Sequence, residues 1–189
     1  FVDGLTLDKR LTMPMTAREI DKIVSGVASA LDFAHRNNLI HRDIKPSNVL
    51  LEQDGTAILS DFGIAKLLDA TASMTNTLLG TPDYMSPEQI TGSPLDARSD
   101  VYALGVMVYR IFAGKTPFQG APMAILHQHV HSAVPEIPPN PLTGRPVPAA
   151  VDEVIRRALA KYPEERQATA GQLAAELRQA LRPQILAEQ

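Results

Sequence analysis

The stretch "LIHRDIKPSNVLL", residues 39–51, places a His, an Arg, an Asp, a Lys and an Asn within eight positions, between two apolar runs. Polar side chains are costly beside buried segments unless each has a partner. The apolar flanks predict rigid elements on both sides, and the polar centre predicts a loop between them. We expect Asp43, Lys45 and Asn48 to carry chemistry on this loop.

The composition is that of an ordinary folded protein. The 189 residues are 44% hydrophobic and 21% charged, which suits one domain with a core or two small ones. The net charge of −3 argues against a surface that neutralises nucleic-acid phosphates. The absence of cysteine excludes disulfides and thiol chemistry, and suits a reducing compartment. The sequence lacks both an apolar run of about 18 residues and a signal-peptide pattern at its start.

Apolar spacing predicts a long amphipathic helix over about residues 17–36, directly before the polar loop. After the loop, two short apolar runs at 48–51 and 57–60 flank Asp54-Gly55, a pair typical of hairpin turns. We therefore expect the polar loop to lie between a helix and a β-hairpin, both of which would hold it in place.

The second half of the chain is predicted to be helical. Residues 100–114 are apolar on nearly every face, which indicates a buried central helix that ends at Gly114. The stretch 61–88 lacks a clear period and is expected to be a long functional loop. Capping boxes are expected where Thr16 precedes Glu19 and where Thr169 precedes Gln172. Further helices are expected at 121–131, 149–160 and 170–181, and a proline-rich extended connection at 135–148.

The second hairpin strand leads into "SDFG", residues 60–63, which would bring Asp61 back toward Asn48. Carboxylate and amide oxygens suit Mg²⁺, which takes few protein ligands and shares the rest with phosphates and water. Asp43 would then accept a hydroxyl proton while Lys45 neutralises charge on a transferred phosphoryl group. Phosphoryl transfer depends mainly on positioning and electrostatics, so these residues point to that chemistry.

Three motifs resemble the eukaryotic-type serine/threonine protein kinases, in particular their bacterial branch. "HRDIKPSN" (41–48), "DFG" (61–63) and "GTPDYMSPE" (80–88) occur in the order and spacing of that family. "GKTPF" (114–118) and "KYPEER" (161–166) also match. The resemblance implies a mainly α fold, the kinase C-terminal lobe. In that lobe a helical bundle surrounds a buried central helix, and a small β-hairpin carries the catalytic loop.

The resemblance covers residues 1–189 as one C-terminal lobe, with the hinge end at 1–7, the catalytic loop at 41–48 and the activation segment at 61–88. No Gly-x-Gly-x-x-Gly motif occurs in the sequence. The N-terminal lobe, which supplies half of the nucleotide site, is therefore expected outside this chain. We expect negligible phosphoryl transfer from the chain alone, and activity in the full-length parent.

The resemblance implies a role for each residue of the catalytic centre, with ATP and Mg²⁺ (or Mn²⁺) as cofactors. Asp43 would be the catalytic base and Lys45 a phosphate contact, while Asn48 and Asp61 would be the metal ligands. Val2 would meet adenine through its backbone, Leu50 would lie beneath the base, and Thr81 would hydrogen-bond near Asp43 and Lys45 to shape the substrate site.

Other residues are implied to hold the lobe together. Glu88 and Arg166 would form a buried ion pair, and Asp100 would hold the catalytic-loop backbone from the central helix. His41 would be a packing residue near Phe62. Phe62 and Gly63 of the "DFG" motif would likewise have structural roles.

Regulation is implied by Arg42, because kinases with an Arg before the catalytic Asp are often switched by phosphorylation of the activation segment. A phosphate carries a charge of roughly −2 and pairs with Arg, which orders the segment. Thr75 and Thr77 resemble the autophosphorylated pair of bacterial relatives, and Thr75 is the preferred site. Ser86 stands where the family motif more often has Ala, a small-for-small change to which we assign no role.

Two other functions are weighed against the kinase. A non-catalytic binding module would use the lobe as a docking surface, but it has no physical need for the four polar residues of the centre together. A small-molecule kinase is the second alternative, and the segment 80–88, a platform for a protein chain, argues against it. The histidines of "HQHVH" (127–131) are a weak metal candidate, since His127 and His131 could pair on a helix while His129 points elsewhere.

The partners implied are ATP, protein substrates with Ser or Thr, and the N-terminal lobe in cis, with no nucleic acid. The kinase domain is expected in the cytoplasm. Its parent could be membrane-anchored through a segment outside these residues.

Overall fold

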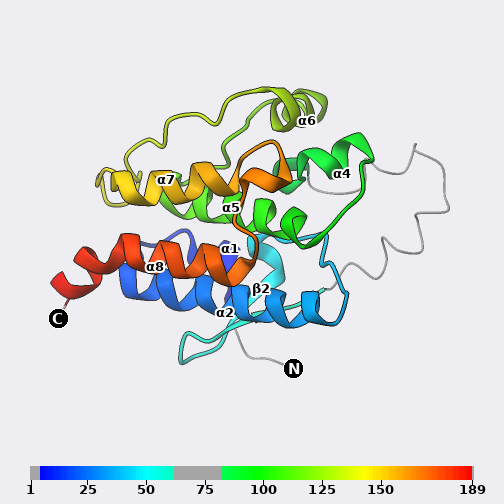
Figure 1. The fold of residues 1–189 in the computed structure, drawn as a ribbon. Helices are drawn as coiled ribbons and strands as arrows, with labels where there is room; N and C mark the ends of the chain where they lie inside the picture. Colours follow the sequence, from blue (N-terminus) through cyan, green and yellow to red (C-terminus); the bar gives the residue numbers. More distant parts are fainter. Residues whose placement is uncertain (1–4, 62–81, 189) are drawn as a thin grey trace.

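The computed structural model describes residues 5–61 and 82–188 as a mainly helical lobe with one small sheet (Figure 1). Across these residues, no helix is both long enough and apolar enough to cross a membrane. The elements are strands β1 (Leu5–Thr6), β2 (Val49–Leu51) and β3 (Ala57–Leu59), helices α1 (Leu7–Arg10), α2 (Ala17–Arg36), α4 (Pro87–Thr91), α5 (Ala97–Ala113), α6 (Pro122–His131), α7 (Ala149–Ala158) and α8 (Ala170–Ala187), and short 3-10 helices η1 (Pro46–Asn48), η4 (Pro82–Tyr84) and η5 (Pro163–Glu165).

Helix α2 forms where its apolar spacing predicted it. Thr16 Oγ1 accepts a hydrogen bond from the Glu19 amide at 3.1 Å, which caps the first turn. The reciprocal half of the expected capping box is missing, because the Glu19 carboxylate binds the Arg10 guanidinium at 2.7 Å instead. The buried face of α2 packs against α8, its neighbour in Figure 1, and against β3. The chain therefore enters the polar loop at 41–48 from a firmly packed helix.

The predicted hairpin is present, but it belongs to a three-stranded antiparallel sheet in the order β1-β2-β3. Leu50 pairs with Ile58 on one side and with Thr6 on the other. In the turn, the Asp54 carboxylate accepts from the Thr56 amide at 2.7 Å. β1 has two residues, too few to show the alternation that indicates a strand, so the sequence did not predict it.

Helix α5 is the buried centre of the lobe, as its apolar composition predicted. It begins at Ala97, earlier than the predicted residue 100, because Asp96 Oδ1 accepts from the Arg98 amide at 2.8 Å and caps the helix there. It ends at Gly114, whose φ of 71° is a left-handed conformation that glycine adopts easily. A Cβ at Gly105 would lie 2.6 Å from Ala158 Cβ, so the missing side chain lets α5 and α7 approach closely.

Helix α8 continues to Ala187, so its predicted end at 181 was wrong. The apolar pattern that set this boundary stops at Leu181, but the added turns have another function. The Glu188 carboxylate accepts from the backbone amides of Ala17 at 2.7 Å and Arg18 at 3.1 Å, at the N-terminus of α2. A carboxylate there satisfies unpaired N–H groups and complements the helix dipole. At the start of α8, the expected box is also half formed, because Gln172 Oε1 accepts from Ala168 and not from Thr169.

Candidate active site

The polar loop predicted at 41–48 runs from the end of α2 into η1 and β2. Lys45 Nζ lies 2.8 Å from Asp43 Oδ2, and these two side chains are 23% and 22% exposed. Asn48 is buried, and its Nδ2 donates to the Asp43 carbonyl at 2.8 Å and to Asp43 Oδ2 at 3.1 Å. The three residues expected to act together are therefore in contact, and the charged pair reaches solvent.

Asp61 follows β3 and lies beside the same loop. The link is Ser60, whose amide donates to the Asn48 carbonyl at 2.9 Å, while its Oγ lies 3.1 Å from that carbonyl and 3.2 Å from Asp61 Oδ2. Asn48 gives the bonds of its Nδ2 to Asp43, so its Oδ1 is the amide atom left to bind a cation. The Asp61 side chain is exposed. A carboxylate and an amide oxygen held in this way fit a hard divalent cation such as Mg²⁺.

The backbone at Arg42 is held in the left-handed region, with a φ of 67°. Such a conformation costs about 1–3 kcal/mol for a residue with a side chain. Asp100 Oδ1 accepts from the Arg42 amide at 2.9 Å, and Asp100 Oδ2 accepts from the His41 amide at 2.8 Å. On the other side, Gln89 Nε2 of α4 donates to the Arg42 carbonyl at 3.1 Å. The Asp100 contact is the one that the resemblance implies, whereas the Gln89 contact had no signal in the sequence.

His41 is fully buried, as a packing residue would be, and it also bonds at both ring nitrogens. Its Nε2 lies 3.0 Å from the Ser60 carbonyl, which can only accept, so Nε2 carries the proton. Its Nδ1 then accepts from the Asp43 amide at 3.3 Å. His41 therefore connects the polar loop at 41–48 to the end of β3.

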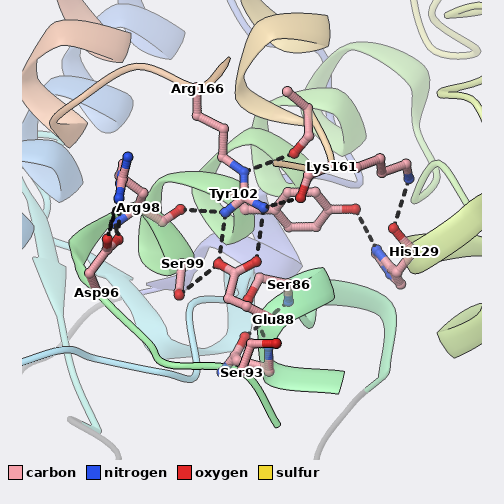
Figure 2. Close-up of polar contacts among 12 residues, drawn as sticks. Ser86, Glu88, Ser93, Asp96, Arg98, Ser99, Tyr102, His129, Lys161 and Arg166 are labelled. Carbon is pink, nitrogen blue, oxygen red and sulfur yellow. Dashed lines mark hydrogen bonds and ion pairs between the residues drawn. The ribbon is translucent and has the colours of Figure 1, made fainter. Parts of the chain in front are cut away.

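Glu88 of α4 and Arg166 form a buried ion pair (Figure 2). Arg166 Nη1 and Nη2 lie 2.7 and 2.9 Å from the two carboxylate oxygens, and Ser99 Oγ donates to the carboxylate at 2.7 Å. Burial alone would raise the pKa of Glu88, but hydrogen bonds from Arg166 and Ser99 hold that pKa below its ordinary value. The resemblance implies this same contact, which joins two segments far apart in the sequence. The other N–H groups of Arg166 donate to the backbone carbonyls of Arg98, Ala160 and Lys161.

Ser86, to which the sequence assigned no role, caps helix α4. Its Oγ accepts from the Gln89 amide at 3.4 Å, and its own amide donates to Gln89 Oε1 at 3.0 Å, which completes a capping box. The Nε2 of the same Gln89 side chain reaches Arg42. An Ala at position 86 would have the right size but no hydroxyl for the cap.

The alternating histidines of α6 separate into two groups. The rings of His127 and His131 lie 4.7 Å apart, as their spacing allowed, and both residues are exposed. His129 is fully buried, with Nδ1 2.8 Å from the Tyr102 hydroxyl and Nε2 3.1 Å from the Asp83 carbonyl. No group of three or more potential metal ligands occurs in the part of the chain that the structure describes. Sequence reasoning missed the role of His129, although its spacing from buried Ile125 placed it on the inner face of α6.

Leu50, expected beneath the nucleotide base, lies half-buried in the middle strand β2. Other residues expected in the site lie outside the described residues: Val2, Phe62, Gly63, Thr75, Thr77 and Thr81.

The chain belongs to the protein kinase family, since the protein kinase domain matches residues 1–177. It is 39% identical over 183 residues to the serine/threonine-protein kinase PknB of Mycobacterium tuberculosis (strain ATCC 25177 / H37Ra), and 40% identical over 182 residues to PknB of Mycobacterium leprae (strain TN). Each match covers 94% of this chain but 29% of the relative, so the chain spans less than a third of these proteins.

A solved structure supports the same assignment. The crystal structure of a double mutant of the Mycobacterium tuberculosis PknI kinase domain matches with a TM-score of 0.71 and 30% identity, over 95% of this chain and 63% of that chain. The expected relationship to bacterial serine/threonine kinases and the expected helical, kinase-like fold are thus confirmed.

Proposed function

We propose that this chain is the catalytic large lobe of an enzyme that transfers the γ-phosphoryl group of ATP to Ser and Thr hydroxyls of proteins. The observation that carries the proposal is the contact of Asp43 with both Lys45, at 2.8 Å, and Asn48, at 3.1 Å. The relatives named serine/threonine-protein kinases support the substrate class.

Asp43, Lys45 and Asn48 would each have a separate role in the transfer. Asp43 would orient the attacking hydroxyl and accept its proton at a carboxylate oxygen. Lys45 would place a positive charge beside the transferred phosphoryl group, because its ammonium is already held next to Asp43. Asn48 would fix the Asp43 side chain through Nδ2. Positioning and electrostatics of this kind supply most of the catalysis in phosphoryl transfer.

Asn48 Oδ1 and the Asp61 carboxylate would hold Mg²⁺ (or Mn²⁺), which neutralises phosphate charge when bound with ATP. The remaining nucleotide contacts would come from Leu50, Val2 and an N-terminal lobe in cis, and Thr81 would shape the substrate site. ATP is an intracellular nucleotide, so we place the active site in the cytoplasm.

Regulation by phosphorylation is a further part of the proposal. Among the described residues, the buried Arg42 Nε has no hydrogen-bond partner, which leaves a donor for a phosphate. A phosphate on Thr75, or on Thr77, would supply the charge. Mass spectrometry after incubation with ATP, with the Asp43→Asn protein as reference, identifies the modified residue.

The test is transfer of radiolabelled phosphate from ATP to a generic basic protein by the full-length gene product. Asp43→Asn is expected to lower transfer by a factor of about 10² to 10⁴, the usual contribution of a general base. Asp152→Asn, on α7, is the matched control and should transfer label at the wild-type rate. If the intact protein transfers no more label than the Asp43→Asn form, the proposal fails.

The same assay separates the alternatives. Label transferred to small molecules but not to proteins would identify a small-molecule kinase, and partner binding without any transfer would identify a non-catalytic module. Residues 1–189 alone are expected to transfer label at the background rate, because they contain no Gly-x-Gly-x-x-Gly motif to cover the phosphates.

A further inference from the structure

His129 lies in a buried polar network that no part of the proposed catalysis uses. Its ring packs edge-on against Phe118, with centroids 4.8 Å apart, and against Tyr102, with centroids 5.6 Å apart. Both His129 and Tyr102 are fully buried. Burial of a polar ring is costly unless its nitrogens are hydrogen-bonded, and both nitrogens of His129 have partners.

The two bonds fix the tautomer of His129. The Asp83 carbonyl can only accept, so Nε2, 3.1 Å away, carries the proton and donates. Nδ1 must then accept from the Tyr102 hydroxyl at 2.8 Å. Burial, together with the nearby Lys161 ammonium, lowers the pKa of His129 to about 4, which keeps this neutral form at physiological pH. Lys161 Nζ itself donates to the His129 carbonyl at 2.7 Å and so caps the end of α6.

These bonds continue the network around Arg166, as Figure 2 shows. Tyr102 presents its ring to the Arg166 guanidinium at 4.8 Å, and Arg166 holds Glu88. The contacts therefore form a continuous series from Asp83 in η4 through His129, Tyr102 and Arg166 to Glu88 in α4. The segment between η4 and α4 is anchored at both ends from the same buried tyrosine.

This segment is also bonded to the catalytic loop. Gln89 of α4 donates to the Arg42 carbonyl, directly before Asp43. Gln89 thus bonds the α4 end of the segment to the loop before Asp43. His129 bonds its η4 end, where Arg110 also bonds Tyr84 and Thr116 also bonds Asp83. The resemblance to protein kinases implies that residues 80–88, to which this segment belongs, form the platform for the protein substrate.

We propose that His129 is a positioning residue that holds the η4 turn for binding of the protein substrate. The role in substrate binding rests on the proposed kinase function. The holding of the η4 turn rests on the contacts of Asp83, Tyr102 and Arg166. His129 does not touch the reacting atoms. Its removal should therefore weaken binding of the protein substrate and leave binding of ATP unchanged.

The test compares variants of the full-length gene product in steady-state kinetics, with a peptide substrate and ATP varied in turn. His129→Leu, which removes both hydrogen bonds from a similar volume, should raise the KM for the peptide about tenfold, the effect of losing one or two buried hydrogen bonds. The KM for ATP should stay within about twofold of the wild-type value. His129→Gln can still donate to Asp83, and should recover about half of the lost affinity on a logarithmic scale.

The control is His127→Leu, which makes the same change two residues away on the exposed face of α6. It should leave both KM values at the wild-type level. Equal rises in both KM values for His129→Leu, or an unchanged KM for the peptide, would overturn the positioning role. So would a His127→Leu protein with the same kinetics as His129→Leu.

A second measurement does not depend on activity. The Met85 amide donates to the Pro82 carbonyl and closes the η4 turn, so its hydrogen exchange reports on that turn. His129→Leu should speed this exchange about tenfold, and His127→Leu should not change it. A wild-type protein without transfer activity would refute the proposed function, and exchange at Met85 would still show whether His129 holds the η4 turn. Unchanged exchange in His129→Leu would refute the inference even in an active kinase.

Discussion

The ion pair of Glu88 and Arg166 offers the sharpest test of what holds the lobe together. Glu88→Gln keeps the shape of the side chain but removes its charge. Arg166 is 2% exposed and would keep its backbone carbonyl partners, but its charge would lie buried without an anion. The perturbation therefore isolates the charge of one partner.

The expected cost of Glu88→Gln is about 3–5 kcal/mol, the range for breaking one side of a buried pair. This cost is a large share of the 5–15 kcal/mol that stabilises a typical domain. In a domain of this size, 1 kcal/mol corresponds to about 2–4 °C in Tm, so the Tm should fall by about 6–20 °C. Glu88→Gln combined with Arg166→Met should cost less than the sum of the two single changes, because no charge is then left unpaired.

The assay is thermal and urea unfolding of each variant, followed by circular dichroism. The matched control is Arg157→Met, whose pair with Glu176 has the same 2.7 Å distance but lies at the surface, with side chains 45% and 28% exposed. Exposed pairs contribute about 0–1 kcal/mol. If Glu88→Gln costs no more than Arg157→Met, the reasoning from burial is wrong.

Three further predictions concern stability. Asp100→Asn should lower the free energy of unfolding by about 1–3 kcal/mol in urea unfolding, because an amide cannot accept all the hydrogen bonds from the His41 and Arg42 amides; an unchanged midpoint would contradict this. Gly105→Ala should lower the Tm, because the new Cβ would lie 2.6 Å from Ala158 Cβ. The cost of overpacking, about 1–3 kcal/mol, outweighs the gain of about 1 kcal/mol in helix propensity. A raised Tm would show that helix propensity dominates. The pKa of Glu88 lies below its ordinary 4.5 in the folded state, so its charge stabilises the fold above pH 4.5, and this contribution is lost as the pH falls further. The Glu88→Gln protein should therefore lose less stability than the wild type on acidification below pH 4.5. Parallel acid-unfolding curves of the two proteins would refute the assignment.

Local signals in the sequence predicted most of the fold. Apolar spacing gave the full extent of α2, and Asp54-Gly55 gave the hairpin. The errors arose where contacts outside the local sequence pattern decide the structure. The strand β1 exists because β2 offers an unpaired edge, and α8 extends because Glu188 meets the start of α2. Both capping boxes were half formed because Glu19 and Gln172 found other partners.

The candidate site was predictable only in part. Asp43, Lys45 and Asn48 lie close in sequence, so their contact follows from a short loop. The path from Asp83 through His129 to Tyr102 joins three separate elements, and no spacing in the sequence relates them. His129 is buried between two exposed histidines because of contacts with other elements, and the periodicity of the sequence indicated this burial only weakly.

The left-handed backbone at Arg42 is bonded by a residue that the ribosome adds much later. The Arg42 amide donates to Asp100, which lies 58 residues later in the chain. At about 5–20 residues per second, a ribosome needs roughly 3–12 s to synthesise that interval. A nascent chain that ends shortly after residues 41–48 therefore lacks the carboxylate that bonds the backbone beside Asp43, until the central helix α5 has been made.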